Sequence, residues 1–165
     1  MTHSARLVDL VSERIEAFIE DRAPILGPLG PDVTPLVDFS RNFLSGGKRF
    51  RALFTYWGFK AIVDSDEASA PFDSDTDEHL DVIVGVAAAL EIFHAAALVH
   101  DDIIDNSETR RGQLSAHAGF RELHRGSGYR GSADRFGRSA GILFGDLLLG
   151  WSDELLDESL AKLPD

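Results

Sequence analysis

Hydrophobic residues recur every three to four positions along most of this chain, which is the spacing of helices with one buried face. Residues 7–23 follow this pattern until a proline-rich stretch at 24–31 interrupts it. The pattern returns over 35–44 and 48–63, with a glycine pair between the two segments. These segments predict three helices in the first part of the chain.

The second part of the chain carries the longest apolar run. From about Asp81 to Asp105 the sequence is rich in alanine, and it predicts a long buried helix that ends in carboxylates. Two more helices are predicted at 115–126 and 138–163, with a loop over 126–137. An acidic, polar stretch at about 64–78 is predicted to be a surface loop. No segment alternates with the period of a strand, so we expect an all-α bundle of about six helices.

Composition and charge narrow the class of protein. The 165 residues suffice for one domain or for part of a larger one, and a hydrophobic share of 44% can form a sizeable core. The net charge of -12 argues against nucleic acid and against an anionic membrane surface as partners. The chain has no cysteine, which excludes disulfides and thiolate metal sites. It has no signal-peptide core and no run long enough to span a bilayer, so we expect a soluble cytoplasmic protein.

Three aspartates at the end of the longest predicted helix indicate a metal site. Asp101 and Asp105 are four residues apart, so their carboxylates converge on one face, and Asp102 lies about 100° around the axis. Neighbouring carboxylates repel one another, and a divalent cation removes that repulsion. Carboxylate oxygens suit Mg²⁺, with Mn²⁺ as a second option. The alternative is an acidic helix end in solvent, although the helix dipole disfavours anions there.

The sequence GGKRFR at 46–51 predicts an anion site. Paired glycines let the backbone approach a ligand, and the helix that follows offers free N–H groups. Lys48 and Arg51 are three residues apart and share a helix face, so with Gly47 they would make a diphosphate clamp. The pattern is not a Walker A loop, and the alternative is a helix start with solvated charges.

Further candidate residues flank the aspartates. Arg110 and Arg111 point in different directions because they are adjacent, so they could grip two anionic groups, unless they are a surface pair matched to nearby acids. His94 precedes Asp101 by seven residues and shares its face, so it is either a site residue or a hydrogen-bonded core histidine. His117 is a further candidate for the same site.

Together, the segments GGKRFR, EIFHAAALVHDDIIDNSETRRG and AGILFGDLLLG resemble the trans-isoprenyl diphosphate synthases, also called polyprenyl synthetases. The family's first aspartate-rich motif, DDxxD, is DDIID here, and the arginine pair follows it at the family's spacing. The resemblance implies a helical bundle of the isoprenoid synthase type and an Mg²⁺-dependent prenyltransferase. The implied reaction condenses an allylic diphosphate with isopentenyl diphosphate to a longer polyprenyl diphosphate, as in geranylgeranyl-type synthases.

The resemblance also implies a role for each candidate residue. Asp101 and Asp105, with Asp102 close by, would bind the Mg²⁺ that coordinates the allylic diphosphate, and Arg110 would grip that diphosphate too. Isopentenyl diphosphate would be held by Gly47, Lys48, Arg51, His94 and Arg111. Ala96 and Ala97 lie about one turn before Asp101 and leave room for a product of about twenty carbons or longer, with Phe93 as a later floor.

The resemblance covers only about the first half of the family's usual length. Beyond Arg111 the acids are scattered, and no second DDxxD follows; Asp146 matches a family segment but is not that motif. We therefore expect residues 1–165 to be the N-terminal part of a single polyprenyl synthetase domain and to be inactive alone. The full-length form is expected to be a homodimer without a membrane span.

Two other hypotheses remain open. His100 and Asp101, with His79 and Asp146 as further ligands, would make an HD-type metal-dependent phosphohydrolase, which leaves GGKRFR and the arginine pair unexplained. A non-catalytic helical subunit that acts by association would use the apolar AGILFGDLLLGW segment as part of an interface. A nucleotide-hydrolysis assay tests the first hypothesis, and sedimentation combined with a prenyl-transfer assay tests the second.

Overall fold

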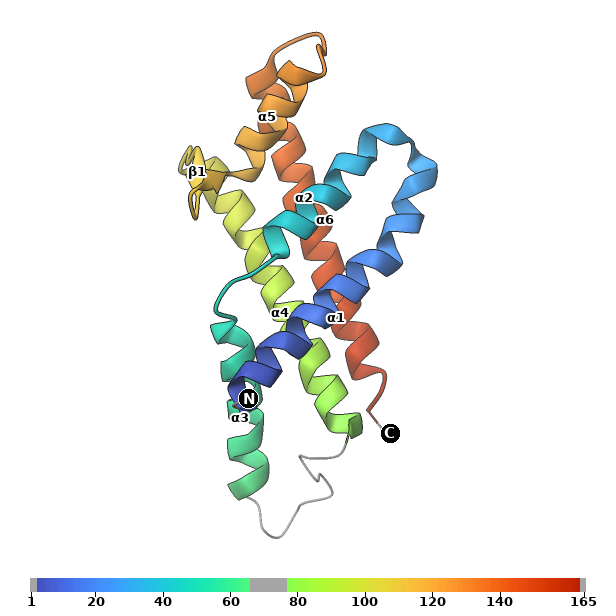
Figure 1. Ribbon diagram of the computed structural model, residues 1–165, viewed down its shortest axis with the longest axis vertical. Coiled ribbons are helices and arrows are strands. Elements are labelled where there is room, and N and C mark those ends of the chain that lie inside the picture. Colours follow the sequence, from blue (N-terminus) through green and yellow to red (C-terminus); the bar gives the residue numbers. More distant parts are fainter. Residues whose placement is uncertain (1–2, 66–76, 164–165) are drawn as a thin grey trace.

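The computed structural model describes residues 3–65 and 77–163, which fold into helices almost throughout (Figure 1). The α-helices of this described part are α1 His3–Leu26, α2 Thr34–Leu44, α3 Phe50–Ser65, α4 Asp77–Ile104, α5 Ala116–Gly126 and α6 Ala133–Leu160. Two 3₁₀ turns, η1 Gly27–Leu29 and η2 Pro31–Val33, join α1 to α2. An antiparallel hairpin of β1 Thr109–Arg110 and β2 Gln113–Leu114 joins α4 to α5. The prediction of an all-α fold with about six helices is confirmed.

The two longest helices, α4 and α6, pack side by side through the middle of the structure (Figure 1). Glycines allow their backbones to approach closely. A Cβ added to Gly145 of α6 would lie 2.5 Å from His100 Nε2 of α4, and one added to Gly85 of α4 would overlap the Ser159 side chain of α6. These contacts fix how α4 lies against α6.

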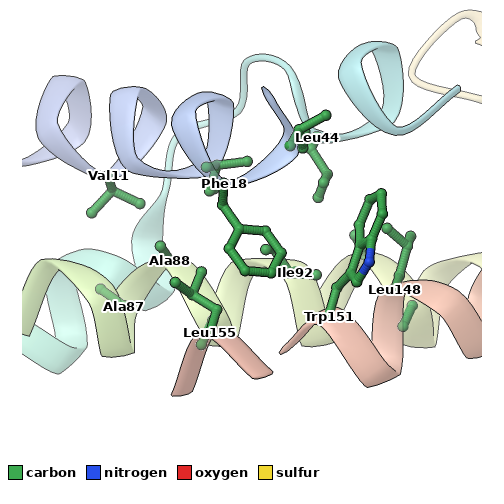
Figure 2. Packing of buried hydrophobic residues seen from close by; sticks show 14 of the residues in the cluster. Val11, Phe18, Leu44, Ala87, Ala88, Ile92, Leu148, Trp151 and Leu155 are labelled. Atoms are coloured by element: carbon green, nitrogen blue, oxygen red, sulfur yellow. The ribbon is translucent and has the colours of Figure 1, made fainter. Parts of the chain in front are cut away.

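The apolar core lies where α1 crosses the α4–α6 pair. Figure 2 shows Phe18 of α1 reaching down toward the Trp151 side chain of α6, with Ile92 of α4 beside them. The rings of Phe18 and Trp151 meet edge to face with their centroids 6.0 Å apart. Each large apolar side chain buried here contributes about 1.5–3 kcal/mol to stability. The core therefore holds α4 in one orientation, and with it the aspartates at its C-terminal end.

Several helix boundaries and one connection differ from the sequence prediction. Helix α6 begins at Ala133, inside the predicted loop 126–137, because Ser132 caps it by accepting a hydrogen bond from Arg135 N at 3.3 Å. Helix α4 begins at Asp77, inside the predicted acidic loop 64–78, and residues 66–76 of that loop lie outside the described residues. The hairpin was not predicted, because strands of two residues are too short to display a period of two.

Helix α4 is also the most apolar element. Its segment His79–Ile104 is long and apolar enough to cross a membrane by length and composition, so the expectation that no run reaches that length was wrong. However, 67% of its most apolar window is buried inside the structure. A helix that is apolar on most of its faces is typical of the centre of a bundle, and α4 occupies that position here.

Candidate active site

The C-terminal end of α4, where the sequence carries the aspartates, lies beside the β1–β2 hairpin (Figure 1). The Asp101 side chain is 58% exposed, and Asp105 is exposed as well. The Asp102 side chain is only 1% exposed. This difference follows from helix geometry, because Asp101 and Asp105 share one face and Asp102 lies about 100° away. Two carboxylates are therefore open to a ligand and the third is not.

Asp102 is held by Arg110 in a two-pronged ion pair. Arg110 Nε donates to Asp102 Oδ2 at 2.8 Å, and Arg110 Nη2 donates to Asp102 Oδ1 at 2.7 Å. These hydrogen bonds raise the pKa of Arg110, and the charges of the aspartates raise it further. The same Nη2 lies 3.7 Å from Asp101 Oδ2. Asp102 thus orients Arg110 next to the open carboxylate of Asp101.

The hairpin turns the two adjacent arginines toward different places. Arg111 and Gly112 are its two turn residues, with φ angles of 53° and 79°. Positive φ at both central residues is the type I′ geometry that two-residue hairpins favour. Arg110 reaches Asp102, whereas Arg111 lies beside Gly47, where an added Cβ would be 3.5 Å from Arg111 Nη1. Arg110 therefore belongs to the aspartate end, and Arg111 to the glycine loop.

The glycine loop, residues 45–49, connects α2 to α3. Its φ angles are positive at Gly46, Gly47 and Arg49, with values of 68°, 101° and 47°, so the chain turns sharply. Lys48 is consequently exposed, and Arg49 is buried. Helix α3 begins at Phe50, two residues later than predicted, and presents Arg51 on its exposed first turn.

Two adjoining cavities lie between the glycine loop, α4 and the hairpin. We call the larger, of about 490 Å³, the loop cavity; its walls include Gly47, Lys48, Arg51 and Arg111. The smaller, of about 130 Å³, is the hairpin cavity; its walls include His94, Arg110 and Arg111. Both cavities share Ser45, Arg49, Glu91 and Arg111. The fold thus gathers all six residues predicted to bind substrate around two adjoining cavities.

His94 is a partly buried residue surrounded by cations. Burial is the main factor that lowers its pKa, and Arg51, Arg111 and Arg110 lower it further against the opposing effect of Glu91. The imidazole is therefore neutral near pH 7. In that form it can donate one N–H to an anionic ligand without adding a charge.

Two residues that line both cavities were not recognised as site residues in the sequence analysis. Arg49 was part of GGKRFR but received no role, and Glu91 was counted within the apolar run. Their side chains form a buried ion pair, with Arg49 Nη1 3.6 Å from Glu91 Oε2. The available signal was a lone glutamate among apolar residues, because a charge in a buried helix needs a partner. Conversely, His117 lines a different cavity with Arg121 and Arg138.

The exposed aspartates fit a magnesium ion that is shared with a ligand. Within residues 3–65 and 77–163, no group of three histidine, aspartate or glutamate side chains converges into a complete metal cage. Mg²⁺ does not need one, because it commonly takes one or two carboxylates together with waters and substrate phosphates. Asp101 and Asp105 match that donor set. Asp102, the third predicted ligand, accepts hydrogen bonds from Arg110 with both of its carboxylate oxygens.

The ligand set of an HD-type phosphohydrolase does not assemble. His79 and His100 are 21 residues apart on the single helix α4, which separates them by about 31 Å. They cannot bind one metal centre, so this hypothesis is wrong. His100 instead lies with its Nε2 3.4 Å from Asp146 Oδ1, across the contact between α4 and α6.

Comparison with known proteins agrees with this arrangement. The sequence model of the Polyprenyl synthetase family matches residues 35–164. The chain belongs to the polyprenyl synthetase family. The match includes the glycine loop, the aspartates, the hairpin and the start and end of α6. The resemblance inferred from the motifs is therefore confirmed.

Several curated members of the polyprenyl synthetase family are similar in sequence. The nonaprenyl diphosphate synthase of Mycobacterium tuberculosis is 32% identical over 114 residues, which is 69% of this chain and 25% of that protein. The geranylgeranyl diphosphate synthase of Sulfolobus acidocaldarius is 31% identical over 159 residues, which is 96% of this chain and 36% of that protein. This chain therefore spans about a quarter to a third of the length of these relatives.

A solved structure of the same kind shares the fold. It is the crystal structure of geranylgeranyl pyrophosphate synthase from Corynebacterium glutamicum, complexed with isoprenyl diphosphate and magnesium. The superposition has a TM-score of 0.81 at 34% sequence identity, and it covers 93% of this chain and 41% of that one. The helices described here thus follow the path of a polyprenyl synthetase over nearly their whole length.

Proposed function

We propose that this chain provides the two diphosphate sites of a prenyltransferase that condenses an allylic diphosphate with isopentenyl diphosphate. The observation that carries the proposal is the splayed arginine pair. Arg110 lies against the aspartates and Arg111 lies against Gly47, so one hairpin serves two separate anion sites. A reaction that joins two diphosphate esters needs two such sites side by side.

The aspartate end is the proposed allylic site. Asp101 and Asp105 would hold Mg²⁺, which when bound neutralises the charge of a diphosphate and makes it a better leaving group. Arg110 adds a fixed guanidinium fork next to Asp101, oriented by Asp102. The Corynebacterium synthase, crystallised with isoprenyl diphosphate and magnesium, supports this assignment.

The loop cavity is the proposed site for isopentenyl diphosphate. Lys48, Arg51 and Arg111 supply its positive charge, and the Gly47 backbone can approach the ligand because no Cβ intervenes. Neutral His94 contributes a hydrogen bond from the adjoining hairpin cavity. In the proposed reaction the allylic carbon–oxygen bond breaks, the alkene of isopentenyl diphosphate forms the new carbon–carbon bond, and a proton leaves to the released diphosphate.

An apolar stripe on α4 is the proposed track for the hydrocarbon chain. Ala97, Phe93 and Leu90 precede Asp101 on its exposed face, and Ala97 and Phe93 lie one and two turns before it. The stripe leads to an apolar cavity of about 260 Å³ that Val86 lines, about 22 Å along the helix from Asp101. This length favours a product of C20 or longer, in line with the names of the relatives.

The structure changes which alanine would gate that chain. Ala96 is 2% exposed and belongs to the core, so it does not face the stripe as the sequence argument assumed. Ala97 is exposed on the stripe, one turn before Asp101. We therefore assign the gating position to Ala97, with Phe93 as the next residue along.

The remaining expectations belong to the same proposal. We propose that residues 1–165 form the N-terminal part of a single polyprenyl synthetase domain, that the full-length form is a cytoplasmic homodimer, and that no segment of it spans a membrane. The metal is proposed to be Mg²⁺, with Mn²⁺ as a substitute. Neither nucleic acid nor an anionic membrane surface is a proposed partner, because the net charge is -12.

Calorimetry tests the proposed sites. The chain is titrated with farnesyl diphosphate, with and without MgCl₂, and separately with isopentenyl diphosphate. We expect allylic binding that requires magnesium and isopentenyl binding that does not. Labelled isopentenyl diphosphate in a parallel transfer assay reports turnover. A folded chain that binds neither compound contradicts the proposal.

A role in association is a second candidate, and exposed apolar side chains favour it. Phe54 and Ile62 of α3, Ile104 of α4 and Leu143 of α6 are each at least two-thirds exposed. Large exposed apolar patches commonly mark interaction surfaces. This role is compatible with the diphosphate sites, because none of these four side chains lines the loop cavity or the hairpin cavity.

A further inference from the structure

Arg49 and Glu91 form an ion pair inside the wall that the two cavities share. Arg49 is 6% exposed and Glu91 is 8% exposed, and Arg49 Nη1 lies 3.6 Å from Glu91 Oε2. One partner comes from the glycine loop and the other from the middle of α4. The pair therefore links an irregular segment to the most central helix of the structure.

Arg49 also links the glycine loop to α2. Its Nη2 donates to the Leu44 carbonyl at 2.6 Å, and Leu44 is the last residue of α2. The carbonyls at a helix C-terminus lack partners within the helix and attract cations. One guanidinium thus bridges the end of α2 and the side of α4, across the loop that carries Gly47 and Lys48.

The pair is poorly arranged for stability alone. Arg49 Nε and Glu91 Oε1 are buried without a hydrogen-bond partner, and burial lowers the pKa of Arg49. Arg49 also has a positive φ of 47°, which is uncommon for any residue other than glycine. Buried ion pairs with unsatisfied atoms seldom stabilise a fold more than apolar side chains of equal size. A role in placing neighbouring groups accounts for the pair better.

The neighbours of the pair are the cations of the loop cavity. Lys48 precedes Arg49 directly, Arg51 follows it by two residues, and Arg111 lines both cavities with it. These like charges repel one another. The charge of Arg111, for example, lowers the pKa of Arg49. Glu91 is a carboxylate in the shared wall and opposes that repulsion.

We propose that Arg49 and Glu91 are a positioning pair for isopentenyl diphosphate. The pair clasps the glycine loop to α2 and α4, so that Lys48 and Arg51 face the loop cavity together with Arg111 before the ligand arrives. This inference rests on the proposed function, and neither residue needs to touch the ligand. The allylic site does not depend on the clasp, because Asp102 and the hairpin hold Arg110 separately.

The double variant Arg49→Met/Glu91→Gln tests the role, since it removes both charges and leaves no unpaired one in the core. The control is Arg14→Met, which removes an ion pair to Glu158 between α1 and α6, away from the cavities. Thermal unfolding checks that each variant is folded. Calorimetry then measures the dissociation constants of isopentenyl diphosphate and, with MgCl₂, of farnesyl diphosphate.

We expect the double variant to bind isopentenyl diphosphate at least about tenfold more weakly and farnesyl diphosphate within about threefold of the wild type. The control should bind both as the wild type does. Adding Lys48→Ala to the double variant should weaken isopentenyl binding less than Lys48→Ala alone does, because the pair acts through Lys48. The single variant Arg49→Lys, which keeps the charge, should bind isopentenyl diphosphate more tightly than the double variant does.

Two results would overturn the inference. Unchanged isopentenyl binding in the folded double variant excludes a positioning role, and equal losses for both diphosphates mean that the pair supports only the general fold. If the wild-type chain binds neither diphosphate, the proposed function itself is wrong, and the inference falls with it. The wild-type titration therefore separates the two failures.

Discussion

Asp101 and Asp102 are adjacent, yet the first side chain is open to solvent and the second is enclosed. Lys48 and Arg49 differ in the same way. In both pairs the exposed residue is free to meet a ligand, and the buried one holds a neighbouring part of the protein in place. At the scale of single residues, the candidate site thus sets exposed charges, which are the proposed ligand contacts, directly beside buried supporting charges.

Aspartate substitutions should separate these two roles. Asp101→Asn and Asp105→Asn should weaken Mg²⁺-dependent binding of farnesyl diphosphate at least about tenfold, because amides do not attract the cation as carboxylates do, and should change stability by less than about 0.5 kcal/mol. Asp102→Asn should lower the free energy of unfolding by about 1–3 kcal/mol, because Arg110 loses its charged acceptor. Calorimetry and urea unfolding measure the two effects. Equal stability losses in all three variants contradict the assignment.

The neutral state of His94 predicts a dependence of stability on pH. Burial and nearby arginines lower the pKa of His94 in the folded state, so the unfolded state binds the proton more readily. His94 therefore favours folding above its unfolded pKa of about 6.5, and this contribution is lost as the pH falls below that value toward the folded pKa. His117 acts in the same direction, because burial lowers its pKa too.

Urea unfolding between pH 7.5 and 5 measures this effect, and NMR titration of the His94 ring measures its pKa directly. We expect stability to fall with acidification and the His94→Gln variant to lose less of it than the wild type. A ring that titrates above 6.5 in the folded chain contradicts the prediction.

At the scale of elements, the short β1–β2 hairpin carries two of the six predicted substrate residues. It is anchored on two sides. Arg110 binds Asp102 of α4, and Glu108, just before β1, pairs with Arg121 of α5 at 2.8 Å. These anchors hold a two-residue turn in a geometry that only a few residue types adopt easily.

Gly112→Ala should disturb this turn through backbone strain alone. Nothing lies within 4 Å of a Cβ at Gly112, but its φ of 79° disfavours any side chain. We expect a loss of about 1 kcal/mol in stability and weaker binding of both diphosphates, since Arg110 and Arg111 shift together. Thermal unfolding and calorimetry provide the readouts.

Gly58→Ala is the matched control for that variant. Its added Cβ also meets nothing within 4 Å, but Gly58 lies inside α3 and lacks a positive φ. We expect it to raise stability by about 0.5–1 kcal/mol and to leave binding unchanged. A destabilised Gly58→Ala would mean that the added methyl group, and not the turn geometry, explains the loss at Gly112.

At the scale of the whole molecule, two faces of α4 have different surroundings. One face is covered by α1 and α6, with Ile92 and Val99 fully buried. The other carries Phe93 and Asp101 at the surface. The family members that this chain matches are about three to four times longer than the matched part.

The exposed apolar side chains predict self-association of this chain. Phe54→Glu together with Leu143→Glu should shift it toward the monomer, because charged side chains at positions 77% and 67% exposed disfavour apolar contacts without disturbing the core. Sedimentation velocity over a range of concentrations measures the change. The control is Glu16→Gln, an exposed substitution on α1. A monomeric wild type excludes the association role.

Much of the fold could be predicted because helical periodicity is a local property. The apolar spacing located every helix, and the sequence also indicated the aspartates, the arginine pair and GGKRFR as the candidate site residues. The errors arose at residues whose role depends on contacts with distant parts of the chain. Gly137 suggested a loop but lies inside α6, where an added Cβ would be 2.5 Å from the His117 carbonyl of α5.

The sequence by itself determined which residues carry charge, which segments are helical and which chemical class of ligand they suit, because composition and spacing along one chain are sufficient for this. Only the tertiary structure decided that Asp102 and Arg49 face inward, that Arg110 lies against Asp102 while Arg111 lies against Gly47, and that Glu91 lines both cavities. The physical reason is burial: whether a charge meets a ligand, a partner or water depends on which distant segments pack against it.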